Sequence, residues 1–188
     1  MRLFRVFSWD GRNRAAAAGG PLYVPRRRQG AGRHDAPDQY GALYCSLDAA
    51  SAVAEAIQFL RGHELTADDL RRSDGLVRSL GTLELDPAAR ILDLDDPQVL
   101  ASRGLRPSRI ATLDRHVTQP LARTLYGEGL DGLSWWSTLD ADWTNVTLFH
   151  ERVLPRLRLV SVPEPLTLTS PTLVEAARRL GILIGARG

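Results

Sequence analysis

The feature that most constrains the fold is a short apolar strand that runs directly into an amphipathic helix, between residues 43 and 60. Leu43–Cys45 has the apolar composition of a strand. Ser46 then fits a helix N-cap, and Asp48 lies in the first turn, where the helix dipole favours an acidic residue. Apolar residues follow at helical spacing to about Leu60, at positions 49, 52, 53, 56, 57 and 60, so this helix has one broad apolar face.

Strand-like and helix-like segments occur in irregular order along the rest of the chain. Strands are predicted over residues 3–8, 80–85, 89–94, 133–136, 145–150 and 156–162, the second and third on either side of an Asp86-Pro87 turn. Helices are predicted after Thr66 and over residues 96–104, 118–127 and 171–181. Residues 10–32 are expected to form a loop. Because strands and helices do not alternate regularly, the sequence predicts a single α+β domain over residues 1–188, with mixed or antiparallel sheets and helices, and not a doubly wound or barrel fold.

Composition excludes several kinds of function. All 24 basic residues are arginine, so no lysine is present for Schiff-base catalysis. The formal net charge is only +2, which gives no strong bulk attraction to nucleic acid or to an anionic membrane. The single cysteine, Cys45, excludes an intrachain disulfide and a multi-cysteine metal site. No apolar run reaches the ~20 residues of a membrane helix, and the first residues lack a signal-peptide pattern, so we expect a cytoplasmic protein with no membrane partner.

Common cofactor and metal motifs are absent from the sequence. No G-x-G-x-x-G follows a predicted strand, and there is neither a Walker loop nor a His-Glu-x-x-His pair. The acidic run at residues 93–96 is interpreted as a helix cap at Asp96 preceded by strand-end residues. Cys45 is interpreted as a buried strand residue, because no third group is in view to orient a nucleophilic pair with His34. We therefore expect no metal.

Three polar side chains are candidates for a shared ligand site. Arg33 lies in a turn-rich loop, Tyr44 in the short strand, and Glu55 at the border of the apolar face of the helix. If they converge at one end of a sheet, they suit a ligand with a phosphate, a flat ring and a sugar hydroxyl. Taken singly, each has a plainer use as a surface arginine, a core tyrosine or a solvated helix residue. A fourth candidate, Ser137, ends a tryptophan-rich strand whose rings are expected mostly to pack in the core.

The order of these segments resembles the RES domain, a toxin family of bacterial toxin–antitoxin pairs named for its arginine, glutamate and serine. The resemblance covers about residues 3–160 and rests on segments in the family's order: Gly32-Arg33, a strand ending Tyr44-Cys45-Ser46, Ala-Val-Ala-Glu55 in the helix, Ala89 to Asp95, and Gly132 to Ser137 followed by Asn145 to Phe149. The chain departs from the family at His34 and Asp35, where an aromatic residue and an asparagine are usual.

This resemblance implies a fold related to the ADP-ribosyltransferase toxins and NAD as the substrate. It implies cleavage of the nicotinamide–ribose bond, with phosphate, water or a protein side chain as acceptor. It also implies an Xre-like helix-turn-helix antitoxin as partner, and leaves open a homodimer within the toxin–antitoxin complex. The implied catalytic residues are Arg33 and Glu55, and the implied NAD-binding residues are Arg33, Tyr44, Glu55 and Ser137.

Elementary chemistry suggests roles for these residues. The planar donor fork of Arg33 suits a diphosphate. Glu55 can accept a hydrogen bond from a ribose hydroxyl and offer negative charge to a developing ribose cation. Tyr44 is expected on the ribose or nicotinamide face. Ser137 is expected either beside the nicotinamide ribose or orienting Glu55.

Three alternatives stay open. One is a transferase that places ADP-ribose on a protein target. Another is a binding module without enzymatic activity that uses Arg26–Arg28 on nucleic acid, although a solvated loop is the plainer interpretation of that triplet. The third is a family member that keeps the fold and has lost turnover, which the departures at His34 and Asp35 leave open.

Overall fold

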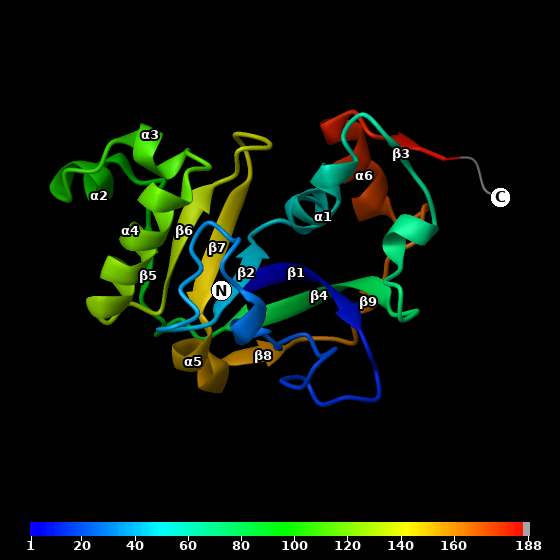
Figure 1. Ribbon diagram of the computed structural model, residues 1–188, viewed down its shortest axis with the longest axis horizontal. Helices are drawn as coiled ribbons and strands as arrows, with labels where there is room; N and C mark the ends of the chain where they lie inside the picture. The colour runs from blue at the N-terminus through cyan, green and yellow to red at the C-terminus, as the bar shows by residue number, and fades with distance from the viewer. Residues whose placement is uncertain (186–188) are drawn as a thin grey trace.

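The computed structural model describes residues 1–185 of the 188-residue chain, and its central element there is an eight-stranded mixed sheet (Figure 1). The strand order is β5 (Ile91–Asp93), β6 (Gly132–Trp136), β7 (Thr144–Phe149), β2 (Ala42–Ser46), β1 (Arg2–Trp9), β4 (Val77–Leu85) and β8 (Leu157–Leu159), with β9 (Glu164–Pro165) also paired to β4. β5 is parallel to β6, and the other neighbours are antiparallel. A two-stranded parallel ribbon joins β10 (Leu183–Ile184) to β3 (Glu64–Leu65). The predicted α+β fold is confirmed.

Helices cover the two halves of this sheet separately (Figure 1). One group is α2 (Pro97–Ser102), α3 (Pro107–Ile110) and α4 (Arg115–Gly127), and the other is α1 (Ala49–Ile57) and α6 (Pro171–Leu180). The short helix α5 (His150–Val153) follows β7, and single 3₁₀ turns occur at Arg26–Arg28, Gln58–Leu60, Asp68–Leu70 and Leu154–Arg156. Within residues 1–185, none of the helices has both the length and the apolar character needed to cross a membrane.

Each half has an apolar core of its own. In the first, Leu125 of α4 packs in one cluster with Leu133 of β6 and Phe149 of β7. In the second, Val53 of α1 and Leu173 of α6 belong to another cluster. The helices are amphipathic, so burying these faces against the sheet or against each other removes apolar surface from water and fixes their positions.

The sheet opens between its two halves, at β1 and β2. β1 pairs with β4 along its whole length, from Arg2↔Glu84 to Trp9↔Val77, but it meets β2 only at Phe4↔Ser46. β2 is paired with β7 over its full length. The strands therefore diverge beyond one point of contact, and side chains from both can face the space between them while their other ladders remain intact.

The boundary between β2 and α1 corrects one prediction. Asp48, and not Ser46, is the N-cap of α1: its Oδ1 accepts a hydrogen bond from the Ser51 amide at 2.9 Å. Ser46 is the last residue of β2 and donates its hydroxyl to Asn145 Oδ1 at 2.7 Å. Both residue types favour N-caps, and only the pairing of β2 with β7 extends the strand through Ser46.

Two helix predictions were also wrong. The helix predicted after Thr66 is a single 3₁₀ turn, Asp68–Leu70, in which the Asp69 carboxylate accepts from the Thr66 amide at 2.8 Å. α4 begins at Arg115 and not at Thr118, because Asp114 caps it by accepting from the His116 amide at 2.9 Å. The strands predicted on either side of the Asp86-Pro87 turn are present as β4 and β5, and they are not neighbours in the sheet.

Other interpretations are confirmed. Asp96 caps α2, with its Oδ1 accepting from the Gln98 amide at 2.8 Å. Cys45 is a buried strand residue. The last helix ends where predicted, since Gly181 follows it in the left-handed conformation (φ 67°) that favours glycine.

Candidate functional site

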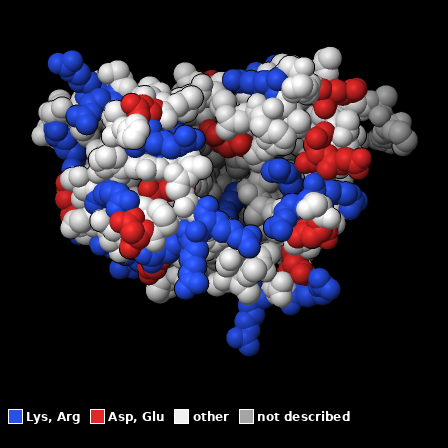
Figure 2. Space-filling view, viewed as in Figure 1, with Lys and Arg blue, Asp and Glu red and all other residues white. Residues whose placement is uncertain are grey.

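A cavity of about 390 Å³ lies where the sheet opens, and Figure 2 shows the molecule hollowed near the middle of this face. Side chains from β1, β2, α1 and the loop before β2 line it, together with residues at the ends of β6 and β7. Three of the four predicted site residues are among them: Arg33, Tyr44 and Glu55. The fourth, Ser137, donates a hydrogen bond to Glu55.

Arg33 brings a half-buried guanidinium group to this cavity. Its Nη2 donates to the Ile110 carbonyl oxygen, and the guanidinium carbon lies 4.2 Å from the centre of the Trp135 ring. Its Nε is buried and has no hydrogen-bond partner among residues 1–185. Burial lowers the pKa of Arg33, and Glu55 opposes this shift. A cation held by stacking, with a buried donor left over, is equipped to bind an anion.

The loop that carries Arg33 is fixed by the Tyr44 hydroxyl. This hydroxyl donates to Asp35 Oδ1 at 2.7 Å and accepts from the His34 amide at 3.0 Å. The other oxygen of Asp35 accepts from the amides of Gly30 and Gly32, each at 2.7 Å. Burial, and then the Asp35 carboxylate, raise the pKa of Tyr44, so the phenol is neutral. Its ring lines the cavity while its hydroxyl is engaged within the protein.

Gly32 is required by this arrangement. A Cβ there would lie 2.5 Å from the Tyr44 hydroxyl and 2.6 Å from Asp35 Oδ1. We expect Gly32→Ala to destabilise the fold by about 1–3 kcal/mol, because those atoms are held by hydrogen bonds and cannot move freely. Urea unfolding measures the change. Gly127→Ala is the control, since a Cβ at that position meets nothing within 4 Å. Equal stability of the two variants would contradict the role given to Gly32.

His34 is buried beside Arg33 and stays uncharged. Its Nδ1 lies 2.8 Å from Thr147 Oγ1, and its ring packs edge-on against Trp135, with centroids 5.3 Å apart. Burial, and secondarily the charge of Arg33, lower the pKa of His34 from 6.5 to about 3. The unfolded chain therefore binds a proton below pH 6.5 that the folded chain does not bind.

The acid sensitivity of the fold should depend on this residue. The stabilisation from neutral His34 is fully present above pH 6.5 and is lost as the pH falls toward 3, by up to about 1.4 kcal/mol per pH unit. We expect His34→Phe to remove that part of the slope. Urea unfolding of both proteins, from about pH 7 down to about pH 4.5, measures it. An unchanged slope in the variant would show that the acid sensitivity arises elsewhere.

Glu55 is held by three donors that come from separate elements. Its Oε1 accepts from Ser137 Oγ at 2.8 Å and from Asn145 Nδ2 at 2.6 Å, and its Oε2 accepts from Gln58 Nε2 at 2.8 Å. Asn145 is itself oriented by Ser46, which donates to its Oδ1. Since a carboxylate offers about four acceptor positions, capacity is left on Glu55 for a hydroxyl group in the cavity.

Sequence reasoning missed several residues of the site. Arg5 lines the cavity from β1, and its two Nη atoms donate to the carbonyl oxygens of Pro21 and, at 3.0 Å, of Tyr23. Asn145 and Gln58 donate hydrogen bonds to Glu55, and the guanidinium group of Arg33 stacks on the Trp135 ring. Only Gln58 leaves a local signal, because it lies three positions after Glu55, at the C-cap of α1, and side chains at this spacing meet on a helix.

The structure also bears on the nucleic-acid alternative. Arg26 pairs with Glu151 at 2.9 Å and donates to the Pro37 carbonyl oxygen, while Arg27 and Arg28 are exposed. Trp135 and Trp143 are both buried, and Trp136 is partly buried. The two buried indoles are therefore not platforms on which an exposed base could stack beside these arginines, which disfavours this alternative.

The fold and the site together define a class of protein. It is a compact α+β protein in which the sheet opens between two strands, and arginines and a hydrogen-bonded carboxylate line the cavity at that opening. The RES domain model matches residues 2–169, and the chain belongs to the RES domain family. No curated protein matches the chain. Among solved structures, the chain is similar to one in the crystal structure of the M. tuberculosis MbcT–MbcA toxin–antitoxin complex. That match has a TM-score of 0.64 and 16% identity and covers 96% of this chain and 88% of that chain, so it shows a shared fold.

Proposed function

We propose that this protein is the toxin of a type II toxin–antitoxin pair and depletes NAD by cleaving the nicotinamide–ribose bond. The observation that carries the proposal is that Arg33, with a buried unpartnered donor, and Glu55, held by three donors, face one cavity in a chain of the RES domain family.

The bond broken is the one between C1′ of the ribose and the ring nitrogen of nicotinamide. The pyridinium nitrogen of NAD is already positive, so the ring takes the bonding electron pair and leaves neutral, without a proton donor. The barrier lies in the ribose cation that forms at C1′. A fixed negative charge beside it stabilises the transition state more than the ground state, which accelerates the step. Glu55 supplies this charge and accepts from a ribose hydroxyl.

The arginines bind the diphosphate. Arg33 offers the guanidinium donors that its bond to the Ile110 carbonyl oxygen leaves free, and Arg5, whose Nη atoms donate to the carbonyl oxygens of Pro21 and Tyr23, adds positive charge from β1 on the lining of the same cavity. Ser137 and Asn145 donate to Glu55 and thereby orient it, which is one of the two roles considered for Ser137. The Tyr44 ring packs against the ribose or nicotinamide, while its hydroxyl keeps the Arg33 loop in place.

The acceptor completes the reaction. An oxygen of inorganic phosphate or of water bonds to C1′, and with water the extra proton is released to solvent. Transfer to a protein side chain is the alternative within the same chemistry. The structural neighbour was solved as a toxin–antitoxin complex, and this supports an antitoxin partner, for which we propose an Xre-like helix-turn-helix protein in the cytoplasm.

The test is the fate of NAD labelled in its adenylate phosphate, incubated with the purified protein. Hydrolysis gives ADP-ribose in any buffer, whereas phosphorolysis gives ADP-ribose with a phosphate on that same C1′ carbon only when phosphate is present. Transfer leaves the label on a protein band when cell extract is added. If NAD stays intact under all three conditions, the proposed activity is wrong.

A further inference from the structure

The segment between β6 and β7, residues 137–143, holds one of the donors to Glu55 and is closed by its own hydrogen bonds. The Ser137 amide donates to the Trp143 carbonyl oxygen at 2.7 Å, and the Leu139 amide donates to Ser137 Oγ at 3.1 Å. The Asp142 amide donates to Asp140 Oδ1 at 3.0 Å. The Ser137 hydroxyl that donates to Glu55 therefore also accepts a hydrogen bond from within this loop.

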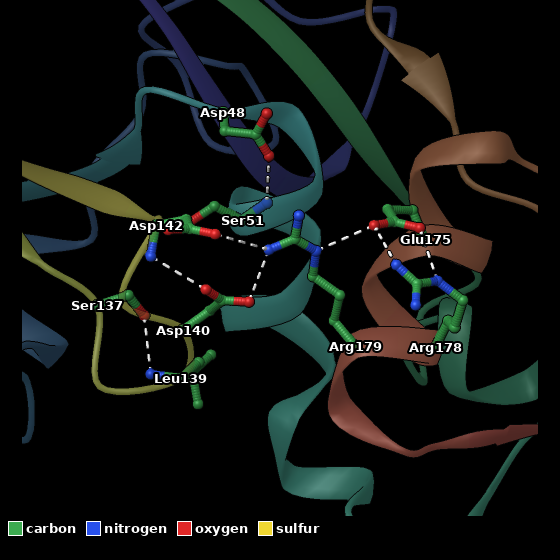
Figure 3. Close-up of polar contacts among 9 residues, drawn as sticks. All are labelled: Asp48, Ser51, Ser137, Leu139, Asp140, Asp142, Glu175, Arg178 and Arg179. Carbon is green, nitrogen blue, oxygen red and sulfur yellow. Dashed lines mark hydrogen bonds and ion pairs between the residues drawn. The ribbon is translucent and has the colours of Figure 1, made fainter.

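Arg179 of α6 binds this loop through ion pairs with its aspartates (Figure 3). Its Nη1 lies 2.7 Å from Asp140 Oδ2 and 3.9 Å from Asp142 Oδ2, and its Nε lies 3.0 Å from Glu175 Oε1 on its own helix. The guanidinium carbon lies 5.2 Å from the centre of the Trp143 ring. Glu175 is shared with Arg178, which contacts no residue of the loop among the ion pairs of residues 1–185.

These ion pairs of Arg179 connect the loop to α1, the helix that carries Glu55. The inner face of α6, including Leu173 and Ala177, is buried in one cluster with Val53 and Ile57 of α1 and with Trp143. α1 and α6 thus pack as one unit, and Arg179 fastens the loop of Ser137 to that unit. α6 begins at Pro171, beyond the residues 2–169 matched by the family model.

We propose that Arg179 is a positioning residue that, through Asp140, holds the 137–143 loop so that Ser137 orients Glu55. This inference rests on the proposed NAD chemistry for its functional consequence. Partly exposed ion pairs such as Arg179–Asp140 contribute little to overall stability. The consequence therefore concerns geometry, since a small displacement of a catalytic group lowers the rate strongly.

The first experiment compares Arg179→Met with Arg178→Met. Methionine keeps an unbranched side chain against Trp143 and removes the charge. Arg178 is the matched control, because it is adjacent on the same helix, is 68% exposed and pairs with Glu175. We expect Arg179→Met to lower kcat for NAD about tenfold with little change in KM, and Arg178→Met to match the wild type.

The second experiment asks whether Arg179 acts through Ser137. In a Ser137→Ala background, Arg179→Met should cause no further loss of kcat, because the contact it positions is already gone. If the two effects multiply, or if Arg179→Met keeps the wild-type kcat, the inference is wrong.

A third measurement separates this inference from the proposed activity. Hydrogen exchange of the Leu139 and Asp142 amides should become about tenfold faster in Arg179→Met and stay unchanged in Arg178→Met, whether or not the protein consumes NAD. Unchanged exchange in both variants would overturn the positioning role even if NAD is consumed. If exchange is faster in Arg179→Met but the wild type does not consume NAD, the proposed activity is refuted. The role of Arg179 in positioning the 137–143 loop is then still supported.

Discussion

Replacing Glu55 by glutamine should lower the rate of NAD consumption about a hundredfold or more while the protein stays folded. Glutamine keeps a carbonyl oxygen that can accept from Ser137 and Asn145, which now lie 2.8 Å and 2.6 Å from Glu55 Oε1, but it has no negative charge. The stabilisation of the ribose cation is lost, whereas binding of NAD in its ground state changes little. The effect should therefore fall on kcat, with KM close to the wild-type value.

The measurement is the initial rate of nicotinamide release over a range of NAD concentrations. Glu164→Gln is the control, because Glu164 is an exposed carboxylate on β9, outside the cavity lining. Thermal unfolding of both variants checks that the fold is intact. A Glu55→Gln protein that turns over NAD as fast as the Glu164→Gln protein would rule out the role of Glu55.

Replacing Arg33 by methionine should lower kcat/KM for NAD about a hundredfold, mostly by raising KM. Arg33 is proposed to bind the diphosphate, which is present in both the ground state and the transition state. Methionine can still pack on Trp135 but cannot donate hydrogen bonds. The kcat/KM of Arg33→Lys should lie between those of the wild type and Arg33→Met. Lysine keeps the charge and lacks the planar donor fork that lies over the Trp135 ring in the wild type.

The same kinetic assay tests this prediction. Arg27→Met serves as the control, because Arg27 is an exposed arginine in the 3₁₀ turn Arg26–Arg28. If Arg33→Met lowers kcat alone and leaves KM unchanged, Arg33 acts on the transition state and not as a diphosphate anchor. If it changes neither constant, the NAD site lies elsewhere.

Local signals in the sequence were enough for much of the fold. The strand around Tyr44 and the helix carrying Glu55 follow from apolar spacing over a few residues, and the structure has β2 and α1 there. The ends of helices were predicted where one residue decides them, as Gly181 does for α6. Errors arose where two residues competed for one role: Ser46 and Asp48 both fit the N-cap of α1, and pairing of β2 with β7 assigns Ser46 to the strand.

Sheet order was beyond the reach of those signals. The Asp86-Pro87 turn places β4 and β5 next to each other in the sequence, yet β4 pairs with β1 and β5 pairs with β6. A turn fixes the direction of a few residues only. The partner of each strand depends on which apolar faces can be buried together, and that is a property of the whole chain.

The sequence by itself determined the kinds of chemical group available: arginines without lysine, one buried cysteine, and a carboxylate at the border of a helix face. The tertiary structure alone decided which groups meet. Ser137 and Asn145 bind Glu55 across 82 and 90 positions of sequence, and Arg33 rests on Trp135. Such contacts follow from the opening of the sheet at β1 and β2 and from the packing of α6 on α1. No local pattern in the sequence encodes these contacts. A hydrogen bond between residues far apart in the sequence contributes to the free energy of folding only after the elements that carry the two residues have packed together.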